Sequence, residues 1–223
     1  MSKKIYINPG HSNVDPGAVG YETERILNVK TANYMNEYLL ANYDCQTKVT
    51  DGSINSVASV AAEANSWGAD LLVSIHNNAG GGDGYEALVY SEKRVPLGQI
   101  FEKYVKAIGQ NSRGVKLRPG LGVLRLSNMP AVLNEGAFVD NQKDIQDWND
   151  EAELNKLGIA YAEAAAEYLK LEKKVAAPAP APVESNVIYR VQVGAYRNLA
   201  NAEDMLKKLE KAGFPGIITK VEK

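Results

Sequence analysis

Three residues of the kinds that bind metals or move protons follow short apolar runs. His11 and His76 are the only histidines in the chain. His11 comes after the run 4–10, His76 after 69–75, and Glu135 after 130–134. Runs of this length and composition are typical of buried strands. In open α/β sheets, ligands and catalytic groups gather just beyond the carboxyl ends of the strands, so we expect these side chains at one edge of a sheet.

Two histidines and one carboxylate form a common catalytic zinc set that leaves a fourth position for water. Two carboxylates are candidates here: Glu135, and Glu24, which would open a helix after the loop 17–21. Glu22 lies only two residues away and competes for the same role. A further carboxylate nearby can take a proton from water and pass it to a leaving group.

Each of these residues also has a purely structural interpretation. A histidine beside an apolar run is commonly a packed or solvent-facing side chain. Glu24 alone could be an acidic first-turn residue that the helix dipole favours. Glu135 could form an ion pair with an arginine such as Arg125. Spacing alone therefore suggests a metal site and leaves these alternatives open.

Strand and helix patterns alternate along most of the chain. Strand-like runs lie near 4–8, 44–50, 70–76, 84–90, 121–126 and 131–135. Helical periodicity starts near Glu24, returns around 54–64 with Ser53 as its cap, and covers 97–108 and 154–171. Alternation of this kind predicts an α/β domain with a mainly parallel, twisted sheet flanked by helices.

The chain has 223 residues, enough for one sizeable core and a small appendage. Its net charge of -2 offers no electrostatic basis for binding nucleic acid. No apolar stretch reaches the roughly 18–20 residues of a membrane span, so we expect none. Because no apolar run of signal-peptide length follows the start, we expect synthesis in the cytoplasm without a signal peptide. The single cysteine, Cys45, excludes an internal disulfide.

One boundary stands out in the composition. Residues 173–186 contain alternating Ala and Pro, which favour an extended, semi-rigid spacer. The sequence therefore predicts a catalytic domain over 1–172, a linker over 173–186 and a small tail over 187–223.

Several motifs in the first domain occur in a characteristic order. They are 7–11, 15–20, Glu24 with Asn28, 69–79 and 129–138. Together they closely resemble the zinc-dependent N-acetylmuramoyl-L-alanine amidases of the Amidase_3 family. The resemblance implies that His11, Glu24 and His76 bind Zn²⁺ and that Glu135 is the catalytic carboxylate. The spacing of Glu24 to Asn28 matches the family pattern and favours Glu24 over Glu22.

The resemblance also implies a substrate and a reaction. The substrate would be peptidoglycan, cut at the amide between N-acetylmuramic acid and the L-alanine of the stem peptide. Glu135 would take the proton of a zinc-activated water and return it to the alanine nitrogen. A non-catalytic wall-binding protein and a zinc peptidase acting within the stem peptide are the alternatives. Lacking a signal peptide, the enzyme would reach the wall after release or lysis, as an endolysin or a sporulation autolysin does.

The tail resembles the opening of a SPOR domain, a fold that binds glycan strands of the cell wall. The similar segments are 188–196 as a strand, 201–209 as a helix and 213–214 before a further strand. The resemblance stops at Lys223, about halfway through the family's fold. A piece below about 40 residues can scarcely bury a core alone. We therefore expect a small, incomplete α+β tail that either was cut short or completes itself by self-association.

Overall fold

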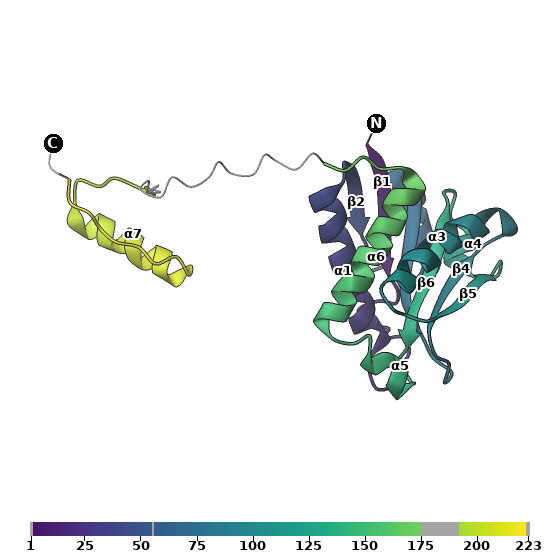
Figure 1. Cartoon of the computed structure of the whole chain (residues 1–223). Helices are drawn as coiled ribbons and strands as arrows, with labels where there is room; N and C mark the ends of the chain where they lie inside the picture. The colour runs from purple at the N-terminus through teal and green to yellow at the C-terminus, as the bar shows by residue number, and fades with distance from the viewer. Residues whose placement is uncertain (1, 55, 175–191, 222–223) are drawn as a thin grey trace. The chain divides into compact units, whose positions relative to one another are not determined.

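The computed structural model describes residues 2–54, 56–174 and 192–221. The chain divides into two compact units, 1–175 and 176–223 (Figure 1). The division between them falls inside the expected linker, most of which lies outside the described residues. Each unit is described by itself.

The first unit is built on a six-stranded sheet with the order β2-β1-β3-β6-β4-β5. The strands are β1 (Lys3–Pro9), β2 (Cys45–Val49), β3 (Leu71–Asn78), β4 (Tyr85–Val89), β5 (Ser112–Leu117) and β6 (Ala131–Phe138). All neighbouring strands are parallel except β4 and β6, which are antiparallel. The expected mainly parallel α/β sheet is therefore confirmed.

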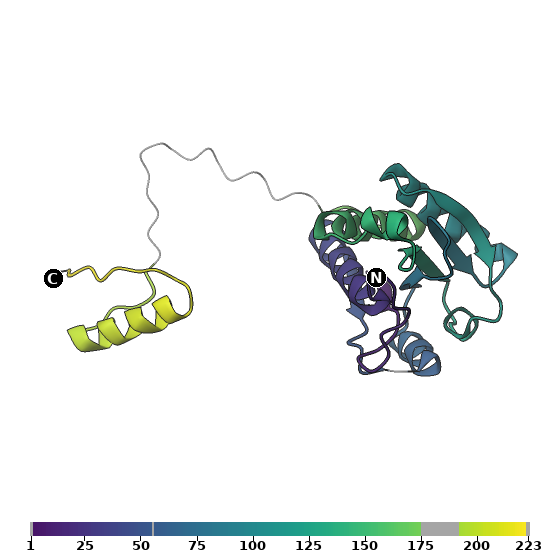
Figure 2. The same cartoon turned by 90° about the horizontal axis from the view of Figure 1, so that it is seen from below.

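Helices cover both faces of this sheet. On one face lie α1 (Glu24–Asn42), α3 (Val95–Ala107) and α6 (Glu151–Leu169), which share the larger apolar core. On the other lie α2 (Val57–Trp67) and α4 (Gly122–Arg125), which share a smaller core. The first unit also contains the short helices η1 (Glu92–Arg94) and α5 (Gln142–Gln146). Figure 2 shows the purple α1 beside the green α6 on one side of the sheet.

Period-two alternation explains why the central strands read as continuous apolar runs. In β3, Leu71 and Val73 face the larger core, whereas Leu72 faces the smaller one. A strand that is buried on both faces needs apolar residues at successive positions. The same alternation places His76 on the face of Leu72, the face that α2 and α4 cover.

Two local expectations were wrong. The run 121–126 was expected as a strand but contains α4, whose Val123 and Leu124 are buried in the smaller core. Short apolar runs fit a buried helix turn as well as a strand. The helix expected from Ser53 begins at Val57, and Ser56 caps it by accepting a hydrogen bond from the Ser59 backbone N–H.

The second unit contains one helix in its described part, α7 (Leu199–Lys211), as the sequence predicted. The expected strand 188–196 lies partly outside the described residues, and 192–196 is not in a strand. Residues 214–221, where a further strand was expected, are not in a strand either. A strand needs a partner for its backbone N–H and C=O groups, and neither 192–196 nor 214–221 pairs with another strand in the described part of this unit.

No helix in the described part of the chain combines the length and the apolarity that crossing a membrane requires.

Candidate metal centre

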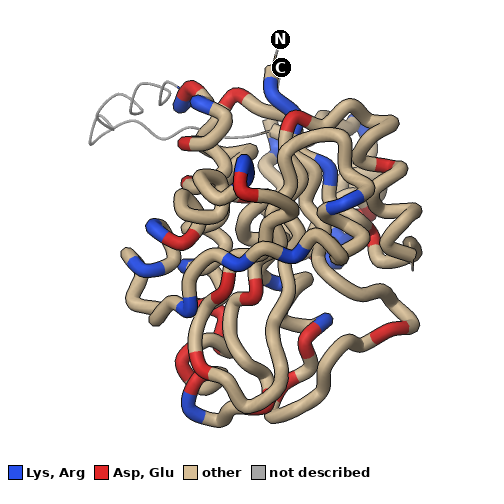
Figure 3. The backbone as a smooth tube through the Cα atoms, turned by 90° about the vertical axis from the view of Figure 1, so that its right-hand side faces the viewer, with Lys and Arg blue, Asp and Glu red and all other residues tan. Residues whose placement is uncertain are grey.

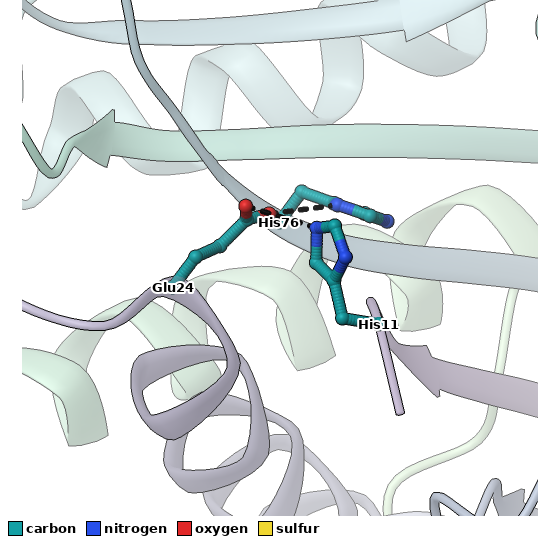
Figure 4. Close-up of side chains that lie close together, drawn as sticks. All are labelled: His11, Glu24 and His76. Carbon is teal, nitrogen blue, oxygen red and sulfur yellow. Dashed lines mark hydrogen bonds and ion pairs between the residues drawn. The ribbon is translucent and has the colours of Figure 1, made fainter. Parts of the chain in front are cut away.

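Three predicted ligands come together from separate elements. His11 follows β1, Glu24 is the first residue of α1, and His76 lies in β3. One donor atom from each lies within 4.8 Å of the other two. Figure 4 shows the Glu24 carboxylate facing both imidazole rings. The parallel pairing of β1 with β3 brings the two histidines to the same end of the sheet.

The Glu24 carboxylate lies between the rings. Its Oε2 is 2.9 Å from His11 Nε2, and its Oε1 is 2.9 Å from His76 Nδ1. The backbone N–H groups of Ala18 and Asn77 donate to the same two oxygens, at 2.9 and 3.2 Å. These contacts hold a carboxylate on a residue that is only 4% exposed.

His11 has an unusual backbone conformation and a second carboxylate partner. Its φ of 68° lies in the left-handed region, which costs a non-glycine residue about 1–2 kcal/mol. Its Nδ1 is 2.9 Å from Asp15 Oδ2, and Asp15 Oδ1 accepts a hydrogen bond from the Gly17 backbone N–H. Backbone strain that is held in place in this way is typical of functional sites. Asp15 fixes the ring so that Nε2 points at Glu24.

Two glycines let the backbone approach the three side chains. A Cβ on Gly10 would lie 2.2 Å from His76 Cε1. A Cβ on Gly17 would lie 2.6 Å from Glu24 Oε2, and Gly17 also has a φ of 71°. Any larger residue at either position would displace a predicted ligand.

The site is strongly polarised. The hydrogen bond to Glu24 raises the pKa of His11 to about 9, with Asp15 contributing and burial opposing. Burial by itself raises the pKa of Glu24, but hydrogen bonds from His11 and His76 outweigh it and hold that pKa well below its usual range. An ionised carboxylate beside imidazoles is ready to bind a cation, which would compete with the proton on His11.

Glu135 lies beside this group but outside it. It pairs directly with His76 in the register between β6 and β3. Its Oε2 is buried and has no hydrogen-bond partner within the described ranges. Burial raises the pKa of Glu135 to about 7, with Glu24 and Glu86 adding to the effect and His76 opposing it. A carboxyl with this pKa can exchange a proton near neutral pH.

The structure does not place Glu22 at the cluster or pair Arg125 with Glu135. Glu22 accepts a hydrogen bond from Asn149 Nδ2 at 3.3 Å and is not one of the three clustered donors. Arg125 lies in α4, and no ion pair between it and Glu135 occurs in the described part of the chain. The ligand roles of the three clustered residues and the catalytic role of Glu135 stay predictions. The types of the three donors support a metal site. Two imidazoles and a carboxylate suit Zn²⁺.

Sequence reasoning used Asn28 only for its spacing to Glu24 and did not predict the contacts that support this group. Asp15 lies four positions after His11, a spacing that could have suggested the contact. Asn28 donates to Glu24 Oε1 at 3.4 Å, and Asn77 donates to Asn28 Oδ1 at 2.9 Å. The link between Asn28 and Asn77 joins α1 to β3 and has no signal in the sequence.

The fold and this group of side chains together define a hydrolytic enzyme with an α/β catalytic domain and a candidate metal centre. Comparison with known families gives the particular class. The chain belongs to the N-acetylmuramoyl-L-alanine amidase family Amidase_3, which matches residues 5–167, and the SPOR domain family matches residues 185–223. The expected family and its peptidoglycan substrate are thereby confirmed.

Curated relatives span nearly the whole chain. The N-acetylmuramoyl-L-alanine amidase CwlM of Bacillus licheniformis is 32% identical over 223 residues, which cover 96% of this chain and 84% of the relative. The sporulation-specific N-acetylmuramoyl-L-alanine amidase of Bacillus subtilis is 30% identical with the same coverage. The endolysin of Bacillus phage SPP1 is 33% identical over 193 residues, covering 81% of this chain and 71% of the phage protein.

Solved structures show the same catalytic fold. The catalytic domain of the amidase CwlV from Bacillus (Paenibacillus) polymyxa superposes with a TM-score of 0.72 at 27% identity, over 76% of this chain and 99% of that one. The N-acetylmuramoyl-L-alanine amidase of Clostridium difficile 630 gives 0.71 at 28% identity, over 76% of this chain and 97% of that one.

Proposed function

We propose that this chain cleaves the amide between N-acetylmuramic acid and the L-alanine of the stem peptide, with Zn²⁺ as its cofactor. His11, Glu24 and His76 would hold the ion, and Glu135 would act as the acid–base group. The observation that carries the proposal is the group of three donors within 4.8 Å of one another, with the unpaired Oε2 of Glu135 nearby.

The ion, when bound, supplies Lewis-acid chemistry that polarises a carbonyl and lowers the pKa of water. Glu135 then accepts a proton from the attacking water at its carboxylate. The same carboxyl returns this proton to the alanine nitrogen as the amide breaks. Its pKa of about 7 in the metal-free site suits both transfers.

Other residues keep the ligands in position. Asp15 orients His11, and the backbone N–H groups of Ala18 and Asn77 orient Glu24. Partners that fix a metal ligand in this way raise metal affinity because less freedom is lost on binding.

The test is the zinc content of the purified protein together with mass analysis of its products from isolated peptidoglycan. We expect stoichiometric zinc and free stem peptides with an N-terminal L-alanine. Stems cut at an internal bond would support a zinc peptidase instead, and the absence of products would support a wall-binding protein. Glu135→Gln should retain zinc and lose turnover, which separates the acid–base role from metal binding.

The setting we propose is action on the cell wall after release from the cell interior, as an endolysin or a sporulation autolysin. Relatives named for both settings support it equally. Timed expression separates them, because a sporulation autolysin would appear in the mother cell and an endolysin only on phage induction.

For the second unit, we propose glycan binding assisted by self-association. The SPOR match supports the first part. The exposure of the apolar side chains of Phe214, Ile217 and Val221 supports the second, because a contact between two molecules would remove this apolar surface from water. Sedimentation of the full chain and of a chain ending at residue 175 would compare their masses. If the full chain sediments with the mass of a single monomer, as the shortened chain should, self-association would be contradicted.

A further inference from the structure

Three charged residues on β4 and β5 extend the row of polar groups that starts at the candidate metal centre. Glu86 lies directly opposite Glu135 in the antiparallel register of β4 and β6. Directly opposite residues of an antiparallel pair project from the same face of the sheet. His76, Glu135 and Glu86 therefore follow one another across β3, β6 and β4 on one face.

Two basic residues of β5 continue the row. Arg113 Nε donates to Glu86 Oε1 at 2.6 Å, and Lys116 Nζ forms an ion pair with the same oxygen. We refer to Glu86, Arg113 and Lys116 as the basic cluster. Figure 3, which faces the β5 side of the sheet, shows basic and acidic segments interspersed there.

A bulge in β5 accounts for the shared direction of the two cations. Residues three apart on a regular strand point to opposite faces. The register of β5 shifts against β4 between Ser112 and Val115, which inserts one extra residue, and Gly114 takes a φ of 86° there. The bulge therefore turns Arg113 to the face where Lys116 already points. Bulges that redirect a side chain are common beside active sites.

The Arg113 guanidinium is held in place by one hydrogen bond and has further N–H donors available. Its Nε is bound to Glu86, and its carbon atom Cζ lies 5.2 Å from the centre of the Phe138 ring. Within the described residues, no hydrogen bond to its two terminal amino groups is found. The Arg113 side chain is 40% exposed, whereas the Glu86 side chain is 6% exposed. A planar guanidinium that is held through Nε and keeps its two terminal amino groups available can bind a carboxylate with two hydrogen bonds.

The cluster carries an excess of one positive charge. Burial raises the pKa of Glu86, but the bonds from Lys116 and Arg113 outweigh burial and lower it overall, so Glu86 is ionised at neutral pH. One carboxylate cannot neutralise two cations. Within the cluster, one positive charge therefore remains available to bind an anion.

We propose that Arg113 and Lys116 bind a free carboxylate of the stem peptide, one residue beyond the bond that is cut. This inference rests on the proposed amidase function. The residue after L-alanine in the stem is a D-glutamate joined through its side chain, so its α-carboxyl is free or amidated. That group lies one residue, about 3.8 Å of backbone, beyond the alanine. Neighbouring strands are about 4.8 Å apart, so Glu86 on β4 lies about one strand spacing from Glu135 on β6. Arg113 and Lys116 start from the next strand, β5, and their side chains reach back to Glu86.

The experiment compares two synthetic muramoyl peptides that differ only at this position, one with D-isoglutamate and one with D-isoglutamine. We expect the wild-type enzyme to prefer the acid through KM. Arg113→Gln should raise KM for the acid about 10- to 100-fold, with kcat nearly unchanged, and leave the amide substrate unaffected. Lys106→Gln, which removes an exposed charge from α3 on the opposite face, is the matched control. It should leave KM and kcat unchanged for both substrates.

Two further measurements keep the outcomes separate. Arg113→Lys retains the positive charge but lacks the paired N–H donors of the guanidinium. It should therefore keep only part of the preference for the D-isoglutamate substrate. Titration of zinc-loaded protein with the product dipeptides L-Ala-D-isoGlu and L-Ala-D-isoGln measures recognition without turnover. Equal affinity of the wild type for both dipeptides would overturn this inference. A preference for the acid dipeptide in a protein that cleaves no amide would instead overturn the proposed function and leave the carboxylate site standing.

Discussion

Glutamine in place of Glu135 should make the metal-free protein more stable at alkaline pH, although it removes the catalytic carboxylate. Burial of this group without a hydrogen-bond partner raises its folded-state pKa from 4.5 to about 7. At about 1.36 kcal/mol for each pH unit, this gap corresponds to about 3 kcal/mol. Glutamine has a similar shape and no charge, so it avoids this cost.

The sign follows from proton binding. Below pH 4.5 the carboxyl is protonated in both states and costs nothing. Between 4.5 and about 7 the unfolded chain loses its proton first, so the wild-type free energy of unfolding falls as the pH rises. Above about 7 the loss is complete. The stability advantage of Glu135→Gln should therefore grow across this window and level off near 3 kcal/mol at pH 8.

The assay is urea unfolding of both proteins after removal of metal by a chelator, at a series of pH values from 4 to 8. Glu86→Gln is a control of opposite sign on the neighbouring strand, because the pKa of Glu86 is lowered and its ionised form stabilises the fold. That variant should be less stable than the wild type, by an amount that is nearly constant above pH 5, because the contribution of Glu86 is complete above its unfolded pKa of 4.5. A difference between Glu135→Gln and wild type that does not change with pH would refute the reasoning.

Three further substitutions test the candidate metal centre. His76→Ala removes a donor and should abolish stoichiometric zinc binding and turnover with the circular dichroism spectrum unchanged. Asp15→Asn should weaken zinc affinity about 10- to 100-fold in competition with a chromogenic chelator, and unchanged affinity would contradict an orienting role. Gly17→Ala should lower both zinc affinity and stability, since its Cβ would lie 2.6 Å from Glu24 Oε2. Gly68→Ala is its control, having a similar φ of 70° and nothing within 4 Å, and should lower stability alone.

The parts of the fold that the sequence predicted are those where burial dictates residue type. The strands before His11 and His76 are central and covered on both faces, so their apolar runs are unambiguous. The helix that Glu24 opens was predicted for a similar reason, because its buried face repeats with helical spacing. These elements are the ones that carry the predicted ligands.

The strand β5 was not predicted, and the reason is its place at the edge of the sheet. Its residues are half-buried or exposed, and a glycine with positive φ interrupts it. Such a segment has no apolar alternation to detect. The basic cluster was missed with it, because the contact of Arg113 with Glu86 depends on a bulge that only the three-dimensional pairing reveals. Contacts such as that between Asn28 and Asn77 likewise join residues far apart in sequence.

The bulge at Gly114 also affects whether the edge of the sheet can pair with a strand of another molecule. A regular strand at a sheet edge presents a row of free N–H and C=O groups to which a strand of another molecule can add. The extra residue in β5 breaks that row and twists the strand, and the charged Arg113 and Lys116 flank it. The irregularity that turns Arg113 toward Glu86 thus also protects this edge from intermolecular pairing. Specificity and resistance to aggregation therefore depend on the same few residues, and a change in β5 that alters one will alter the other.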